Sequence, residues 1–154
     1  MERLQIDLID YSKSPLPKFN NNMNYILTCI DCFSKFIWAF PLKNKSSSVV
    51  ANTLQNLFCT EGEFEMLQHD QGGEFEGDVI VLCNRWGIQQ KRALPYSSNS
   101  QGQVERANLI LRQATVKYMA ENQTKIFIDA LPSLIYSYNT KNQRSSKFTP
   151  FQIH

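Results

Sequence analysis

The sequence has little that would mark a membrane-bound, secreted or disordered protein. No apolar run approaches the roughly 18 residues that a membrane span needs. Acidic residues at Glu2 and Asp7 interrupt the apolar stretch that a signal peptide requires. Sixteen Lys and Arg against fourteen Asp and Glu give a formal charge of +2, too near balance to indicate a charged partner. A hydrophobic content of 42% over 154 residues instead predicts one folded domain.

Cysteine and histidine are too sparse for a disulfide framework or a zinc site. Four cysteines without a secretory signal are typical of reduced thiols in an intracellular protein. Cys29 and Cys32 form a single CxxC pair, and only His69 and His154 could complete a ligand set. On a strand, the two cysteines would also point to opposite faces. Structural zinc is therefore not expected.

Apolar periodicity predicts a mixed α/β domain. Three β-rich runs with tight connections, residues 4–11, 25–33 and 36–42, favour an antiparallel meander. Pro132 is expected to kink the last helix or to start a new turn there. After the meander we expect a helix over 46–59, a strand over 63–68, a helix over 75–86, a strand over 88–94, and helices over 104–119 and 126–139. This order predicts a mixed sheet with helices on its faces.

Three carboxylates fall where an α/β sheet places reactive groups. Asp7 lies in the middle of the first strand, Asp70 ends the fourth and precedes a Gln-Gly-Gly turn, and Glu105 begins the clearest helix. Brought together, these side chains would form a hard-oxygen site suited to Mg²⁺ or Mn²⁺. Two such ions about 4 Å apart assist phosphoryl transfer by activating the attacking oxygen and stabilising the leaving one.

Each carboxylate alone also has an ordinary structural interpretation. A strand acid commonly faces solvent, Asp70 with its glycines fits an Asx turn, and Glu105 complements the dipole of a helix start. The combination of the three favours a metal site. Asp10, Asp31 and His69 are expected to be structural, because Asp10 and His69 lie an odd number of positions from the candidate ligand on their strand and Asp31 suits a turn.

Longer motifs surround the carboxylates, over Leu4–Asp7, Gln68–Phe75 and Pro95–Asn108. In order and spacing they resemble the catalytic core of retroviral and retrotransposon integrases, the D,D,E group of ribonuclease-H-like polynucleotidyl transferases. Residues 31–38, 138–139 and 149–151 also resemble family segments. Two departures are visible. Arg3 and Leu4 stand where the family often has a tryptophan, and the 34 residues between the last two carboxylates are one fewer than usual.

The resemblance implies a ribonuclease-H-like fold, an α/β architecture in which helices flank a five-stranded mixed sheet of three antiparallel and then two parallel strands. Asp7, Asp70 and Glu105 would hold two Mg²⁺ or Mn²⁺ ions. DNA ends would be trimmed by water, and their 3′-hydroxyls joined to target DNA. Further DNA contacts would come from the loop residues Tyr96, Gln101 and Gly102 and from Asn108 and Arg112 on the following helix.

The resemblance also implies a context for this domain. Residues 1–154 would form an isolated catalytic core, without the zinc-binding and C-terminal DNA-binding regions of full integrases. The core would act on chromosomal DNA in the nucleus, with DNA as its partner and neither a membrane nor a small-molecule substrate. We expect a homodimer or higher multimer through residues 46–59 and 126–139, so that Phe127→Glu should give monomers.

Two other functions are compatible with the same motifs. A domesticated integrase-like domain would bind DNA or protein without catalysis, and an absence of Mg²⁺ or Mn²⁺ binding would favour it. A ribonuclease H shares the sheet, but it normally carries a further acidic residue in its first long helix. Residues 46–59 contain no acidic residue, which weakens this alternative.

Overall fold

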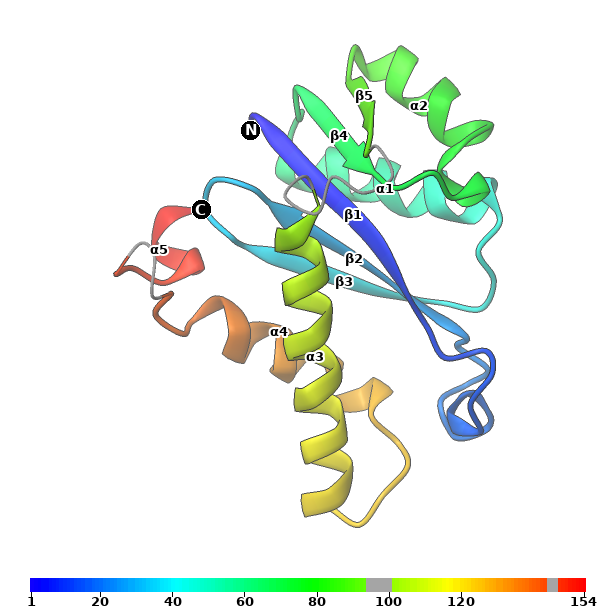
Figure 1. Cartoon of the computed structure of the whole chain (residues 1–154), viewed down its shortest axis with the longest axis vertical. Coiled ribbons are helices and arrows are strands. Elements are labelled where there is room, and N and C mark those ends of the chain that lie inside the picture. The colour runs from blue at the N-terminus through cyan, green and yellow to red at the C-terminus, as the bar shows by residue number, and fades with distance from the viewer. Residues whose placement is uncertain (94–100, 144–146) are drawn as a thin grey trace.

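The computed structural model describes residues 1–93, 101–143 and 147–154, and within them five strands form one mixed sheet. The strand order is β3-β2-β1-β4-β5. The first three strands are antiparallel, and β4 and β5 run parallel to β1, which confirms the expected sheet (Figure 1). The strands are β1 (Arg3–Asp10), β2 (Tyr25–Asp31), β3 (Ile37–Leu42), β4 (Met66–His69) and β5 (Gln89–Arg92).

Helices cover both faces of this sheet, with α3 crossing one face of β1 and β2 (Figure 1). None of the helices in the described ranges is long and apolar enough to cross a membrane. The helices are α1 (Ser47–Glu61), α2 (Asp78–Trp86), α3 (Gly102–Glu121), α4 (Leu131–Asn139) and α5 (Pro150–Ile153), with short 3-10 turns at Leu16–Phe19, Gly73–Phe75 and Ile128–Ala130.

The helix limits follow from local chemistry. The Ser46 side chain accepts the Val49 N–H at the start of α1, and Gly87 ends α2 in the left-handed conformation. The helix expected from residue 75 begins later, at Asp78, because a 3-10 turn and Gly77, with a φ of +52°, precede it. Pro132 lies in the first turn of α4, where a missing N–H costs nothing, so it starts a helix instead of kinking one.

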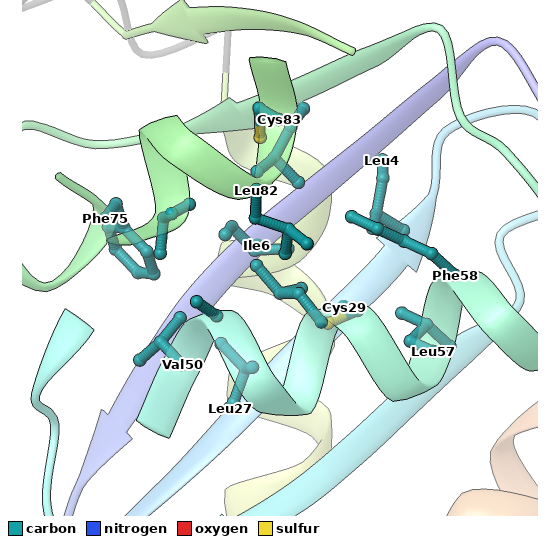
Figure 2. Packing of buried hydrophobic residues seen from close by; sticks show 14 of the residues in the cluster. Leu4, Ile6, Leu27, Cys29, Val50, Leu57, Phe58, Phe75, Leu82 and Cys83 are labelled. Carbon is teal, nitrogen blue, oxygen red and sulfur yellow. The ribbon is translucent and has the colours of Figure 1, made fainter. Parts of the chain in front are cut away.

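The first face of the sheet carries the larger core. Even-numbered residues of β1 point toward α1 and α2, and Leu4 and Ile6 are fully buried there. Figure 2 shows these strand side chains packed against residues of both helices. Burying one such side chain contributes about 1.5–3 kcal/mol. The labelled members of this cluster are Leu4, Ile6, Leu27, Cys29, Val50, Leu57, Phe58, Phe75, Leu82 and Cys83.

The opposite face receives α3 and α4. Ile9, Ile26 and Leu111 belong to one cluster, which also contains Phe127. Phe127 is 1% exposed, and its ring centroid lies 5.2 Å from that of Tyr11. The expectation that Phe127 lies on a dimer surface is therefore wrong: it is a core residue, and Phe127→Glu would disrupt the fold.

Two buried asparagines connect distant segments. Asn139, at the end of α4, accepts the Ile37 N–H and donates to the Ile37 carbonyl, both at 2.9 Å. Asn20 donates to the carbonyls of Leu16 and Lys125, and it accepts backbone N–H groups at the segment before α4. Asn139 thereby pairs with the outer strand β3 as a neighbouring strand would, and this fixes α4 against the sheet.

Replacing Asn139 with alanine should lower the free energy of unfolding by about 2–4 kcal/mol, because both Ile37 backbone groups would lose their partner in a buried position. Urea unfolding followed by circular dichroism measures this change. Asn52→Ala, on the exposed surface of α1, is the matched control and should change stability by less than about 0.5 kcal/mol. Equal effects of the two substitutions would contradict the assigned role of Asn139.

Candidate active site

Asp7 lies on the face of β1 that α3 covers. Its Oδ1 atom accepts the backbone N–H of Leu8 at 2.8 Å, and its Oδ2 atom accepts the Asn108 side-chain amide at 2.8 Å. The side chain is only partly exposed. Burial is the main cause that raises the pKa of Asp7 from 3.8 to about 6; the charges of Asp70 and Glu105 raise it further, and the two hydrogen bonds oppose the rise.

Asp70 follows β4 directly and is exposed. Its Oδ1 atom accepts the Gly72 N–H at 2.8 Å, which is the Asx turn that the sequence favours. A Cβ atom at position 72 would lie 2.8 Å from the Glu74 Cδ atom and 3.0 Å from Asp70 Oδ1, so both acidic side chains would have to shift. Gly72 therefore allows the turn to hold Asp70 at the end of its strand.

Glu105 is exposed in the first turn of α3. The residues beside it, Val104 and Ala107, are fully buried against the sheet, so packing fixes the helix while Glu105 stays accessible. Asn108, one turn further on, is 7% exposed and directs its amide to Asp7. Arg112, two turns on, is exposed and places its guanidinium carbon 5.6 Å from the centre of the Tyr11 ring.

The candidate DNA-contacting residues differ in how exposed they are to solvent. Tyr96 lies outside the described residues. Gln101 is 6% exposed, and its Nε2 atom has no hydrogen-bond partner among the residues described. Gly102 begins α3 and is partly exposed. The Asn108 side chain is buried and donates to Asp7. Of the two candidate DNA contacts on α3 beyond Gly102, Asn108 and Arg112, only Arg112 is therefore exposed to solvent.

Asp7 on β1, Asp70 after β4 and Glu105 on α3 do not form a closed cage. Within residues 1–93, 101–143 and 147–154, no group of three His, Cys, Asp or Glu side chains is arranged to hold a metal ion. The expectation that the three acids converge within reach of a single ion is therefore not met. Their charges still act on one another at Asp7. A partly buried carboxylate with two acidic neighbours has the hard-oxygen donors and the negative potential that suit a divalent cation.

Asp10 and Asp31 have local partners, as expected for structural residues. Asp10 accepts the backbone N–H and the hydroxyl of Ser12, and these hydrogen bonds lower its pKa. Asp31 accepts the N–H and hydroxyl of Ser34 in the turn after β2. The His69 ring centroid lies 5.2 Å from that of Phe75, and its Nδ1 atom contacts the Asp70 backbone carbonyl.

Sequence reasoning missed two further polar residues near this site. Gln5 and Gln68 are 3% and 1% exposed, and they stand beside each other on β1 and β4. A polar residue inside an otherwise apolar strand is the signal that could have found Gln5, because such a side chain requires a buried partner.

Comparison with known proteins decides the family. Residues 1–98 match the family model described as "Integrase core domain". This chain belongs to the integrase core domain family. The expected resemblance to the integrase core is thereby confirmed, and Asp7 and Asp70 lie inside the matched range.

Relatives of this integrase core are parts of much longer polyproteins. The chain is 31% identical over 146 residues to the Pro-Pol polyprotein of Simian foamy virus type 1, an alignment that covers 94% of the chain and 12% of the relative. It is 26% identical over 154 residues to the Retrovirus-related Pol polyprotein from transposon 412 of Drosophila melanogaster, covering 99% of the chain and 12% of that protein. The chain thus spans about 12% of the length of these relatives.

Solved structures confirm the ribonuclease-H-like fold of integrase cores. The HTLV-2 integrase catalytic core domain, solved in complex with magnesium, matches with a TM-score of 0.78 at 18% identity, over 99% of this chain and 95% of that one. The catalytic core domain of BIV integrase matches with a TM-score of 0.76 at 24% identity, over 99% and 92%. A chain of the simian T-cell lymphotropic virus intasome, in complex with the PP2A regulatory subunit B56 gamma, gives 0.85 at 22% identity, over 99% and 54%.

Asp7→Asn should stabilise the metal-free integrase core near neutral pH. Folded Asp7 keeps its proton up to about pH 6, whereas the unfolded chain loses it near 3.8, so wild-type stability falls as pH rises through this window. The variant cannot ionise and avoids the loss, which amounts to at most about 3 kcal/mol. Urea unfolding in EDTA at about pH 4 and near neutral pH measures the difference.

Asp129→Asn is the matched control, because Asp129 is an exposed acid in the turn before α4. It should change the free energy of unfolding by less than about 0.5 kcal/mol. A stability gain of Asp7→Asn that is the same at both pH values would contradict the raised pKa of Asp7.

Proposed function

We propose that this integrase core is a divalent-metal-dependent polynucleotidyl transferase that trims DNA ends and joins their 3′-hydroxyls to target DNA. The observation that carries this proposal is the influence of Asp70, which follows β4, and of Glu105, on α3, on Asp7 of β1: the charges of both acids raise the pKa of Asp7. Membership of the integrase core family supports it. Repulsion among neighbouring carboxylates is typical of functional sites, where a bound cation would compensate the negative charge.

Asp7, Asp70 and Glu105 are the residues that would hold Mg²⁺ or Mn²⁺. The charges of both other carboxylates act on Asp7, so a cation held there would be attracted by all three acids. When bound, the ions would activate the attacking oxygen and stabilise the leaving oxygen of phosphoryl transfer. The magnesium complex of the HTLV-2 core, a protein of the same fold, supports this choice of ion.

The chain's own residues prepare Asp7 for this role. With a pKa of about 6, Asp7 is ionised at neutral pH and ready to bind a cation. The Leu8 N–H and the Asn108 amide each hold one carboxylate oxygen at 2.8 Å, which fixes the orientation of the side chain. The Gly72 N–H orients Asp70 in the same way. Asn108 thus acts through Asp7 and not through Glu105.

DNA is the proposed partner, with element ends and target DNA as substrates. Gln101, Gly102 and Arg112 flank the carboxylates along the start and exposed surface of α3, and Tyr96 completes the set of proposed contacts. Arg112 offers a charge-assisted contact to phosphate. Because such substrates are chromosomal, we also propose that the protein acts in the nucleus.

The carboxylates give the sharpest test of catalysis. Incubated with Mn²⁺ and a branched DNA that mimics the strand-transfer product, the wild type should resolve the branch. Asp70→Asn should reduce the rate at least about 100-fold, because a metal ligand is lost while the shape of the side chain stays the same. The measurement is the initial rate of product formation on a denaturing gel.

Asp78→Asn is the matched control, since Asp78 is an exposed acid at the start of α2; it should keep the wild-type rate. Equal product from wild type and Asp70→Asn would remove the catalytic proposal. Calorimetry with Mn²⁺ then tests the alternative function, because a domesticated integrase-like domain without catalysis would show no heat of Mn²⁺ binding.

We further propose that the core assembles as a dimer or higher multimer through β3, α4 and α5. A shallow apolar groove of about 390 Å³ lies between these elements, and it contains the exposed rings of Tyr136 and Phe151, 65% and 61% exposed. The outer surface of α1, by contrast, presents polar residues such as Asn52 and Gln55. The intasome and the trimeric HTLV-2 core, proteins of the same fold, support self-association.

Tyr136→Glu should shift the protein toward monomers, because a charge in an apolar contact cannot be solvated there. Sedimentation velocity over a range of micromolar concentrations measures the change. Phe33→Glu alters another exposed ring, 73% exposed and outside the groove, and should leave the oligomeric state unchanged. A wild type that stays monomeric, or equal effects of both variants, would contradict this surface.

A further inference from the structure

A buried pair of glutamines joins the three elements that carry the carboxylates. Gln5 on β1 and Gln68 on β4 are partners in the strand register. The Gln5 Nε2 atom donates to the Gln68 Oε1 atom at 3.4 Å. The backbone N–H of Val104, on α3, donates to the Gln5 Oε1 atom at 3.2 Å. One side-chain amide therefore bonds to the neighbouring strand and to the covering helix at once.

The orientation of the Gln5 amide follows from its partners. A backbone N–H can only donate, so the Gln5 oxygen must face Val104 and its nitrogen must face Gln68. Val104 lies in the first turn of α3, where N–H groups have no partner within the helix. The N-cap residue Gln101 makes no capping bond with its side chain. Gln5 thus caps α3 from the sheet.

Each partner stands next to a candidate ligand. Gln5 and Gln68 each lie two positions before a carboxylate, Asp7 and Asp70. Gln5 and Asp7 share one face of β1, and Asp70 directly follows β4. Val104 directly precedes the third carboxylate along α3. A shift in either hydrogen bond would therefore move one carboxylate relative to the others.

We propose that Gln5 and Gln68 are positioning residues that set the spacing of the three carboxylates for divalent cations. This inference rests on the proposed function and deepens it. The two residues act through the backbone of β1, β4 and α3 and do not bind the ion or the DNA. They differ from an ordinary core pair because they tie together the three segments on which the acids lie.

Gln5→Met tests this role, because methionine keeps the length of the side chain and removes the acceptor for Val104. Hydrogen exchange of the Val104 amide, measured by NMR, should accelerate at least about tenfold. The Mn²⁺ concentration at half-maximal calorimetric binding should rise about threefold or more. The Mn²⁺ concentration that gives half-maximal strand transfer should rise by the same factor. A loss of stability alone would lower the maximal rate and leave that concentration unchanged.

Gln90→Met is the matched control. Gln90 is a partly buried glutamine of the same sheet, and its Nε2 atom donates to the Phe75 carbonyl at 3.3 Å, but β5 carries no candidate ligand. Both Mn²⁺ midpoints should stay within about twofold of wild type. Where Gln5→Met does not fold, Gln68→Met is measured in its place.

The outcomes separate this inference from the proposed function. Unchanged Mn²⁺ midpoints in Gln5→Met, with an active wild type, would overturn the positioning role and leave the function in place. A wild type that transfers no strands but binds Mn²⁺ with a Gln5-dependent midpoint would overturn the function and keep the positioning role. A wild type that binds no Mn²⁺ would overturn both.

Discussion

The alternation of side chains along β1 is the constraint on which the rest of the molecule depends. Its even-numbered residues pack beneath α1 and α2, and its odd-numbered residues face α3. Gln5, Asp7 and Ile9 thus follow one another on one face of β1. Gln5 binds the α3 backbone, Asp7 accepts the Asn108 amide, and Ile9 packs in the core. A register shift of one residue would move Asp7 into the apolar cluster beneath α1. The same pairing that builds the core therefore also presents the acid to α3.

The site carries an electrostatic cost that the apolar packing must offset. Asp7 is held partly buried near two other acids, which raises its pKa. Each of its oxygens accepts one hydrogen bond from the protein, and these bonds fix the side chain without neutralising it. A carboxylate whose pKa is raised by burial and by like charges is common at functional sites. A divalent cation held by these residues would lower the repulsion among the carboxylates.

Much of this molecule was predictable because it depends on local pattern. Strands and helices follow apolar periodicity, which is readable in any window of the chain. The local bond of Asp70 to Gly72 was predictable for the same reason, since an Asx turn involves neighbours only. Phe127 shows the limit: its spacing is that of a buried helix face, yet periodicity does not say whether the burying surface belongs to the same chain or to a partner. Its position against Tyr11 answers that question.

The amino-acid sequence alone determined which chemistry was available, namely three acids in motifs of recognisable order on a mixed α/β domain. Tertiary structure decided how far those acids approach one another, which of them Asn108 holds, and that Gln5 joins three elements through one amide. The physical reason is the range of the interactions. Periodicity and turns involve residues a few positions apart, whereas Asn108 and Asp7 are 101 residues apart in the chain. Contacts of that span form only once the sheet and α3 are packed.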